Sequence, residues 1–494
     1  MKKMNLLVMS LVSAAALSFT SCSSNDDLAG NAGQEKVDGF YMTLNVQTPK
    51  SDGTRTVLPK DSTIAASAAE SDVTSGTIYL VDANDNIVFK KKITETEWAA
   101  GKPTEGNDGS TQLKIAVEDV VAGASYKVYF LANAEDAKPN AEDAKPWEDV
   151  FSSKTKFANP YIENSKFAMF NQNDKSVDGN LYTVVFSDDN KKATNGAKIK
   201  YNGVESAIKI ERLTARIDEP TSNATKIKAY TKSDATDAEK KAMEDAVKKV
   251  KSVEMTGYAI SNLADKSYIM QHWTGTTLNI PSDITYYQKK DEFGTATKLE
   301  NGDFFTAPTT EEGKEKHKDY VFENNSSDAA TAMYFEYTVT LEDMKDADFP
   351  EDGTFYRYNN VIYKSFEDIY KAYNDVKGLF GVKTAKEMKD LLIAAKDSKD
   401  GKDVESKLDE FRKAYQIEVF NCGKTYYKQI IKDNNIGYDN AIQRNSIYRL
   451  KVNNIFNVGA QVPNGTPDKE GLFYLDVTVS VNPWVLNTQD VDLK

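Results

Sequence analysis

The sequence is poor in the residues that most enzyme and metal sites need. It has two Cys and two His among 494 residues. A disulfide framework, a Cys/His zinc site and a His-dependent catalytic triad are hard to build from so few. Basic residues are also in the minority, because 62 Lys and Arg face 75 Asp and Glu, for a net charge of −13. A phosphate backbone is bound by clustered Lys and Arg, so we expect no nucleic-acid partner.

Known catalytic motifs are missing as well. The sequence contains no G-x-S-x-G, no G-x-x-x-x-G-K-[ST] and no H-E-x-x-H pattern. His272 and His317 have no Cys, His or carboxylate at metal-ligand spacing. The run Asp82–Asn86 resembles a calcium loop, but Ile87 stands where such a loop needs Gly, so a turn is favoured. We expect no metal, no cofactor and no enzyme activity, although the many acidic residues leave a two-carboxylate glycosidase site open.

The first 22 residues have the pattern of a lipoprotein leader. Lys2 and Lys3 precede an apolar run over 6–17, which is shorter than the roughly 20 residues that span a bilayer. The run ends in Phe-Thr-Ser before Cys22, which resembles a bacterial lipobox. We expect 1–21 to be a signal peptide and Cys22 to be lipidated, with palmitate among the acyl chains. The alternative is an ordinary signal peptide with an incidental Cys.

A strand and a single arginine follow the leader. Apolar side chains alternate with Tyr, Thr, Asn and Gln, which is typical of a half-buried strand. The apolar members are Phe40, Met42, Leu44 and Val46. Arg55 lies in the polar stretch behind this strand and is the only arginine before Arg212. A protease that cuts after Arg would therefore find one target in the first 211 residues, between Arg55 and Thr56; Lys50 and Lys60 would serve a trypsin-like enzyme as well.

Most of the remaining chain has strand patterns, and its richness in Tyr (26) and Phe (22) suits β-sheet. The length fits two or three domains of about 150–250 residues. Expected strands cover 77–93 (a hairpin), 125–131, 207–218, 252–260, 331–340 and 446–458. Helical patterns cover 236–250 and three segments within 365–415, and a tandem copy of seven residues at 133–139 and 140–146 reads as a loop.

The C-terminal region ends on an alternating strand. Its apolar positions are Phe473, Leu475, Val477, Val479 and Val481, followed by Trp484 after Pro483. Besides Cys22 the only thiol is Cys422, and a lone cysteine of this kind is most often a small buried residue.

Several recognisable phrases follow one another along nearly the whole chain. They are SYKVYFLA at 125–132, ERLTAR at 211–216, VFEN at 321–324, TFYRY at 354–358, GKTYY at 423–427, RNSIYRL at 444–450 and Val458-Gly459. In this order and spacing they resemble the major fimbrial subunits of Bacteroidetes, the type V pilins, and the nearest branch is the stalk subunit of the minor (Mfa-type) fimbria.

The resemblance implies a mainly β fold of two tandem transthyretin-like β-sandwiches. The expected division is a signal peptide 1–21, a lipidated propeptide 22–55 with the first strand, an N-terminal sandwich 56–205 and a C-terminal sandwich 206–494. A helical insertion at 365–415 and a donor strand within 473–493 belong to the second. Cleavage after Arg55 would remove the first strand, and the C-terminal strand of the next subunit would fill the groove.

The resemblance also implies partners and a location. The partners are other copies of the chain in a head-to-tail polymer, accessory tip and anchor subunits, an Arg-specific protease, and the outer membrane through the lipid before processing. The predicted product is the stalk of a cell-surface fimbrium that supports adhesion and biofilm formation. A tip or anchor subunit and a surface glycan-binding lipoprotein are the alternatives. The triplet 61–63 resembles a short O-glycosylation motif.

Overall fold

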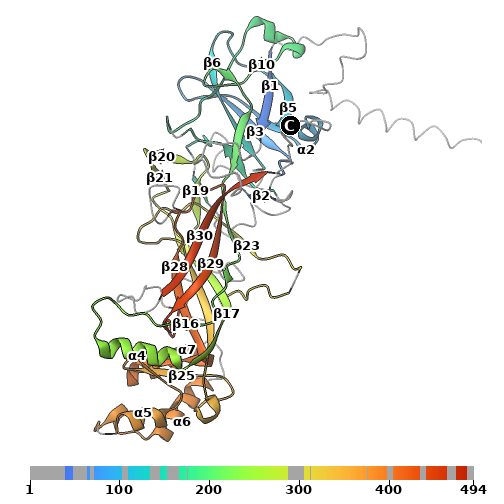
Figure 1. The fold of residues 1–494 in the computed structure, drawn as a ribbon. Helices are drawn as coiled ribbons and strands as arrows, with labels where there is room; N and C mark the ends of the chain where they lie inside the picture. The colour runs from blue at the N-terminus through green and yellow to red at the C-terminus, as the bar shows by residue number, and fades with distance from the viewer. Residues whose placement is uncertain are drawn as a thin grey trace, which may run out of the picture.

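The computed structural model describes residues 39–47, 64–66, 70, 72–102, 110–133, 145–148, 150–152, 166–174, 176–287, 305–311, 313–374, 376–397, 404–433, 441–463 and 474–486. The chain is mainly β, as predicted, and it is elongated (Figure 1). Strand β1 lies in one half of the molecule, and helices α5 and α6 lie at the opposite end.

Eleven of the described strands form one sheet in the half that holds β1. Their order is β10-β1-β13-β8-β6-β9-β11-β12, with β5 beside β1 and the β3–β4 hairpin beside β6. Their apolar faces enclose a cluster that we call the N-terminal core. The bounds are β1 (Phe40–Gln47), β3 (Gly76–Val81), β4 (Ile87–Ile93), β5 (Ser110–Val117), β6 (Ser125–Ala132), β8 (Met169–Asn171), β9 (Tyr182–Val185), β10 (Ala197–Lys198), β11 (Lys200–Tyr201), β12 (Val204–Glu205) and β13 (Ile208–Arg212).

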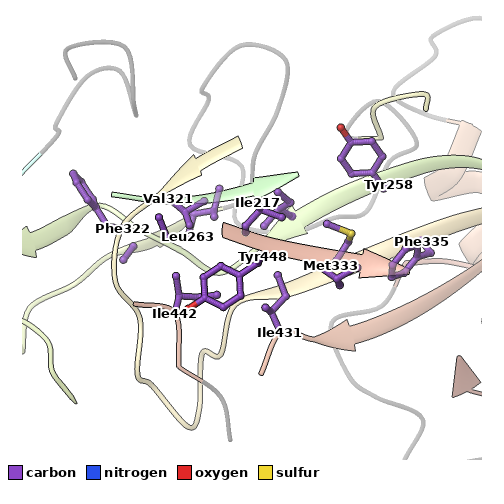
Figure 2. Packing of buried hydrophobic residues seen from close by; sticks show 14 of the residues in the cluster. Ile217, Tyr258, Leu263, Val321, Phe322, Met333, Phe335, Ile431, Ile442 and Tyr448 are labelled. Atoms are coloured by element: carbon purple, nitrogen blue, oxygen red, sulfur yellow. The ribbon is translucent and has the colours of Figure 1, made fainter. Parts of the chain in front are cut away.

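Two further sheets enclose the largest apolar cluster, which we call the C-terminal core (Figure 2). One has the order β2-β30-β29-β14-β23, with β15 and β16 also paired to β29, and the other has the order β17-β24-β28. The bounds are β2 (Ile64–Ala66), β14 (Ala215–Asp218), β15 (Thr221–Ser222), β16 (Ile227–Lys228), β17 (Val250–Ser261), β23 (Lys318–Val321), β24 (Ala332–Leu341), β28 (Lys424–Ile430), β29 (Ser446–Phe456) and β30 (Tyr474–Leu486).

Strand β6 is buried on both faces where the two cores meet. Val128 and Phe130 face the N-terminal core, whereas Tyr129 and Leu131 belong to the C-terminal core. Tyr129 also stacks on Trp147, with ring centroids 4.5 Å apart. The run KVYFLA therefore lacks polar alternation because neither face of the strand meets solvent.

The chain passes from one sheet to the other between β13 and β14. The single strand expected over 207–218 is wrong, because Leu213 and Thr214 break it. Strand β13 pairs with β8 and β1, and β14 pairs with β23 and β29. The break is required because two short strands must serve two different sheets, and it lies a few residues past the proposed division at 205/206.

The predicted helices are present, and capping residues set their starts. Thr236 caps α4 and Thr384 caps α6, each through a capping box with the Glu three residues on. Helices α5, α6 and α7 pack with a small sheet around a third apolar cluster. The bounds are α2 (Glu95–Ala100), α4 (Asp237–Lys248), α5 (Phe366–Ala372), α6 (Ala385–Lys396), α7 (Val404–Tyr415), and short 3-10 turns at Asp188–Lys191, Ala193–Asn195, Met344–Asp346, Leu379–Gly381 and Asn421–Gly423.

Small sheets complete the fold. They pair β7 with β19, β18 with β22, β20 with β21, and β25 with β26 and β27. Over the described ranges, no helix is long and apolar enough to cross a membrane. The bounds are β7 (Val150–Ser152), β18 (Leu263–Ala264), β19 (Lys266–Tyr268), β20 (His272–Thr274), β21 (Thr277–Asn279), β22 (Tyr286–Tyr287), β25 (Phe355–Tyr358), β26 (Val361–Tyr363) and β27 (Glu418–Phe420).

Two local expectations have opposite outcomes. The run Asp82–Asn86 is a turn, as predicted, because the Asp82 carboxylate accepts hydrogen bonds from the backbone N–H groups of Asn84 and Asn86 at 2.9 and 2.8 Å. The expectation that Cys422 is buried is wrong, since this residue is exposed. It sits in a tight turn between β27 and β28 with a φ of 53°, which directs its side chain away from the core.

Val382 is held in a conformation that β-branched residues rarely adopt. Its φ is 69°, in the turn that precedes α6, and its side chain is 84% exposed. A left-handed backbone costs a Cβ-bearing residue about 1–2 kcal/mol, and Asn tolerates it better. We therefore expect Val382→Asn to raise the free energy of unfolding by about 1 kcal/mol in denaturant titrations. Val376→Asn, at a nearby exposed valine without a positive φ, is the control; equal shifts in both variants would contradict a backbone origin.

Candidate assembly site

Strand β1 is an interior strand of its sheet. On one edge it pairs antiparallel with β5 through eight residue pairs, from Phe40↔Val117 to Gln47↔Ser110. On the other edge it pairs in parallel with β10 at Met42 and Thr43, and with β13 at Val46 and Gln47. Both rows of its backbone hydrogen-bonding groups therefore have neighbours, and its removal would leave a slot between β5 and the β10/β13 edge.

The predicted apolar side of β1 fills this slot. Met42, Leu44 and Val46 are each 0% exposed and belong to the N-terminal core, while Phe40 is half-buried against it. The Phe40 ring lies 5.5 Å from that of Phe186. Burial of three such side chains contributes a gross ~5–9 kcal/mol. The strand is thus a substantial part of the core, and the slot without it would expose a long apolar groove.

Strand β5 depends on β1 for its place in the sheet. Among the described strands, β1 is its only pairing partner. Ile115 and Val117 point from β5 into the N-terminal core, and the backbone N–H of Gln112 donates to the carbonyl of Gly101 at 3.0 Å, behind α2. A strand that replaced β1 would have to bridge β5 to β13 in the same way.

The predicted donor strand is paired within its own chain over most of its length. Strand β30 pairs antiparallel with β29 through ten residue pairs, which end at Ser446↔Pro483. Leu475 is buried and Val477 is half-buried against the C-terminal core. Val479 and Val481 lie in the same paired stretch, whereas Trp484 lies beyond it. Only the stretch from Trp484 onward therefore extends past β29.

Beyond Pro483, β30 meets a different neighbour. Trp484, Val485 and Leu486 pair in parallel with Ile64, Ala65 and Ala66 of β2. In Figure 1, β30 runs from the half with the helices toward the half with β1 and ends beside β2. The end of the predicted donor strand thus lies against the segment that follows the predicted cleavage site.

Several predicted site residues lie outside the described residues. These are Cys22, Arg55, Thr56 and Phe473, together with 487–493 of the proposed donor segment. Lipidation and processing therefore stay predictions, and so does the donor role of the C-terminal strand.

A buried charged cluster joins the segment after β2 to the junction between the two halves. The Glu70 carboxylate accepts hydrogen bonds from Arg216 Nη1 at 2.7 Å and from the Tyr320 hydroxyl at 2.8 Å. Arg212 Nε donates to the Glu70 backbone carbonyl at 2.7 Å, and Asp218 pairs with Arg216 at 2.7 Å. Because Arg212 lies in β13 and Arg216 in β14, Glu70 is fastened to both sheets.

The surroundings shift the pKa values of this cluster. Burial lowers the pKa of the Arg212 guanidinium, which is enclosed on all sides. Burial also acts to lower the pKa of Arg216, but the hydrogen bonds and charges of Asp218 and Glu70 outweigh it and raise the pKa. Burial and the neighbouring Glu70 carboxylate raise the pKa of Tyr320. Arg216 is therefore paired with two carboxylates, as a buried ion must be.

A second buried pair fixes the start of β29. Arg444 Nη2 lies 2.8 Å from a Glu323 carboxylate oxygen, and Nη1 donates to the Ile269 carbonyl at 2.7 Å. The Gln271 side-chain amide also donates to Glu323. Arg444 is 0% exposed, so its guanidinium is enclosed in the C-terminal half, two residues before β29 begins.

Some of these residues could have been found from the sequence and others could not. The ERLTAR and RNSIYRL phrases hold Arg212, Arg216 and Arg444, which the structure places in the two clusters. Glu70 has no local signal, since its partners Arg216 and Tyr320 are far away in the sequence. Strand β5 was missed, although its apolar residues Leu113, Ile115 and Val117 alternate.

The described part of the chain shows no group of three or more His, Cys, Asp or Glu side chains placed to hold a metal ion. His272 instead lies near a single carboxylate, with Nδ1 3.8 Å from Asp178, and its ring meets that of Tyr268 edge-on at 4.8 Å. The candidate site therefore consists of two features. One is the slot that β1 occupies, and the other is the C-terminal end of β30.

Comparison with known proteins gives a family match and distant structural likenesses. No curated protein matches the chain. A proposed cell adhesion protein from Parabacteroides distasonis is similar at 12% identity and a TM-score of 0.42, over 91% of this chain and 99% of that one. A fimbrilin from Porphyromonas gingivalis W83 is similar at 14% identity and a TM-score of 0.41, also over 91% and 99%. Identities and TM-scores this low do not show a shared function.

The family match lies in the C-terminal region. Residues 418–490 match the model described as major fimbrial subunit protein type IV, fimbrillin, C-terminal. This range begins at β27, contains β28 and β29, and includes β30. It thus holds the strand that was predicted to be the donor. The C-terminal region is therefore similar to that of the major fimbrial subunits, which confirms over this range the family resemblance predicted from the sequence.

Proposed function

We propose that this chain is a structural subunit of the stalk of a cell-surface fimbria, polymerised by exchange of a β-strand. The observation that carries the proposal is the position of β1. It fills a slot between β5 and the β10/β13 edge, and the only arginine before Arg212 follows it. Cleavage between Arg55 and Thr56 would detach this strand from the rest of the chain. An apolar segment of another copy would then replace it.

The donor in this proposal is the stretch from Trp484 onward. Residues 474–483 pair with β29, so their departure would dismantle ten residue pairs. The stretch past Pro483 lies outside that ladder and can reach another subunit without this loss. Insertion of an apolar strand would restore a gross ~5–9 kcal/mol of burial, less the cost of ordering. Such a head-to-tail joint does not close on itself, so repetition gives a fibre.

Export in this proposal follows the lipoprotein route. Cys22 carries the lipid that holds the precursor at the outer membrane until an Arg-specific protease removes 22–55. Tip and anchor subunits of the same fimbria are further partners. The supporting observations are the leader pattern in the sequence and the family match over 418–490.

The chain's features argue against the two alternative roles, a glycan-binding surface protein and a tip or anchor subunit. A glycan-binding surface would need exposed aromatic platforms, but Trp98, Trp147 and Trp273 are each buried. A tip or anchor subunit would lack either a useful donor segment or a processing site, and this chain has candidates for both. The stalk role is therefore the one that we propose.

Replacement of the cleavage site tests the proposal. We expect Arg55→Ala to leave the precursor folded, to keep residues 22–55 attached in cells and to abolish its polymerisation, because β1 then stays in the slot. The measurement is the N-terminal sequence of the surface protein, with electron microscopy of the fibres. Lys60→Ala, five residues after Arg55, is the control and should leave both unchanged. Wild-type fibres from unprocessed Arg55→Ala protein would overturn cleavage as the trigger.

A further inference from the structure

Strand β2 is the described strand that covers the end of β30. This pairing consists of three residue pairs, Ile64↔Trp484, Ala65↔Val485 and Ala66↔Leu486. The ladder between β30 and β29 has already ended at Pro483. In the described part of the chain, β2 is thus the only strand that pairs with the first three residues of the proposed donor segment.

The chain behind β2 is firmly attached to the body of the molecule. Glu70 is four residues past Ala66 and is held by Arg216, Tyr320 and Arg212. Further on, the Asn133 side-chain amide donates to the Asp72 carbonyl at 2.8 Å, and its carbonyl oxygen accepts from the Thr74 backbone N–H at 2.9 Å. None of these contacts involves residues before Arg55, so all of them remain when the chain is cut there.

Cleavage after Arg55 should barely change the pairing of β2 with β30. The entropy cost of closing a loop grows only with the logarithm of the loop's length. Along the sequence, the attachment at Glu70 is much nearer to β2 than β1 is. The tether through 48–63 therefore adds little to what Glu70 already provides. Strand β2 should still lie on β30 in the processed subunit, and the donor segment must be detached from it before it can enter another subunit.

We propose that β2 is an autoinhibitory clasp, which holds residues 484–486 on the subunit's own surface and so slows strand donation after processing. The clasp rests on the proposed function, since it needs the stretch from Trp484 onward to be the donor. The segment that β2 holds belongs to the same chain, and Glu70 is the positioning residue that keeps β2 beside β30. A three-residue parallel pairing is weak enough to open spontaneously, so it acts as a delay and not as a block.

Proline substitutions in β2 test the clasp. Proline removes backbone donors from the ladder, so Ala65→Pro/Ala66→Pro should free the segment 484–486. We expect faster amide hydrogen exchange at 485 and 486 in the uncut monomer. After limited trypsin cleavage we expect about tenfold faster polymerisation by light scattering, which corresponds to about 1.4 kcal/mol. Ala65→Ser/Ala66→Ser keeps both amides and should behave as wild type.

A disulfide lock gives the converse test. Ala65→Cys/Val485→Cys, in a chain whose Cys22 and Cys422 are replaced by serine, joins two directly paired positions. The oxidised, cleaved protein should stay monomeric, and reduction should restore polymerisation. Equal polymerisation rates for the proline and serine variants would overturn the clasp while leaving the proposed function intact. Normal assembly of the locked chain would overturn the clasp and also show that the donor segment begins after residue 486. If no variant polymerises after cleavage, the proposed function fails, and unchanged hydrogen exchange in the proline variant would then overturn the clasp separately.

Discussion

Replacement of Arg444 by leucine is expected to lower the free energy of unfolding by about 3–5 kcal/mol, the range for breaking a fully buried ion pair. The Arg444 guanidinium is enclosed, and one of its nitrogens lies 2.8 Å from Glu323. Leucine would leave the Glu323 carboxylate buried without its counter-charge. The carbonyl of Ile269 would also lose its donor. The measurement is a denaturant titration of the uncut chain.

Arg449→Leu is the matched control for this prediction. Arg449 lies in the same strand β29, but its side chain is 50% exposed, and its partner Asp218 keeps a second guanidinium from Arg216. Exposed pairs of this kind contribute at most about 1 kcal/mol. Arg444→Lys should rescue only part of the loss, because an ammonium cannot reproduce the planar fork. Losses of the same size for Arg444→Leu and Arg449→Leu would show that burial of the pair is not what holds β29.

The sequence predicted several elements from local patterns alone. Met42, Leu44 and Val46 alternate with polar residues because only one face of β1 lies against the core. The cap residues Thr236 and Thr384 are equally local signals, since a helix start is satisfied within four residues. In such elements, residues that are near one another in the sequence determine the structure.

Apart from β5, whose alternation is a local signal, the missed features depend on contacts between distant parts of the chain. The break at Leu213 and Thr214 exists because β13 and β14 serve different sheets, which no local pattern shows. Glu70 is recognisable only once Arg216 and Tyr320 lie beside it. The alternation in β30 predicted a strand but not its partner, so the division at Pro483 between β29 and β2 came from the structure. Pairing partners are long-range properties, whereas periodicity is a local one.

Truncation of Leu44 to alanine should weaken the uncut chain but speed the assembly of the cut one. Leu44 is 0% exposed in the N-terminal core, so the truncation should lower the free energy of unfolding of the precursor by about 2–5 kcal/mol. A more weakly held β1 would leave its slot sooner after cleavage at Arg55. We expect polymerisation of the cut protein at least about tenfold faster than wild type, because each 1.4 kcal/mol corresponds to a factor of ten.

The final fibres should nevertheless be identical, because the substituted strand is removed on processing. Gln47→Glu, on the opposite face of β1, is the control, and its effect on precursor stability should stay within about 0.5 kcal/mol. Fibre stability in denaturant and fibre shape by electron microscopy should not distinguish Leu44→Ala from wild type. If Leu44→Ala instead weakens the finished fibre, the strand Phe40–Gln47 stays in the mature subunit, and another strand must then make the joint between subunits.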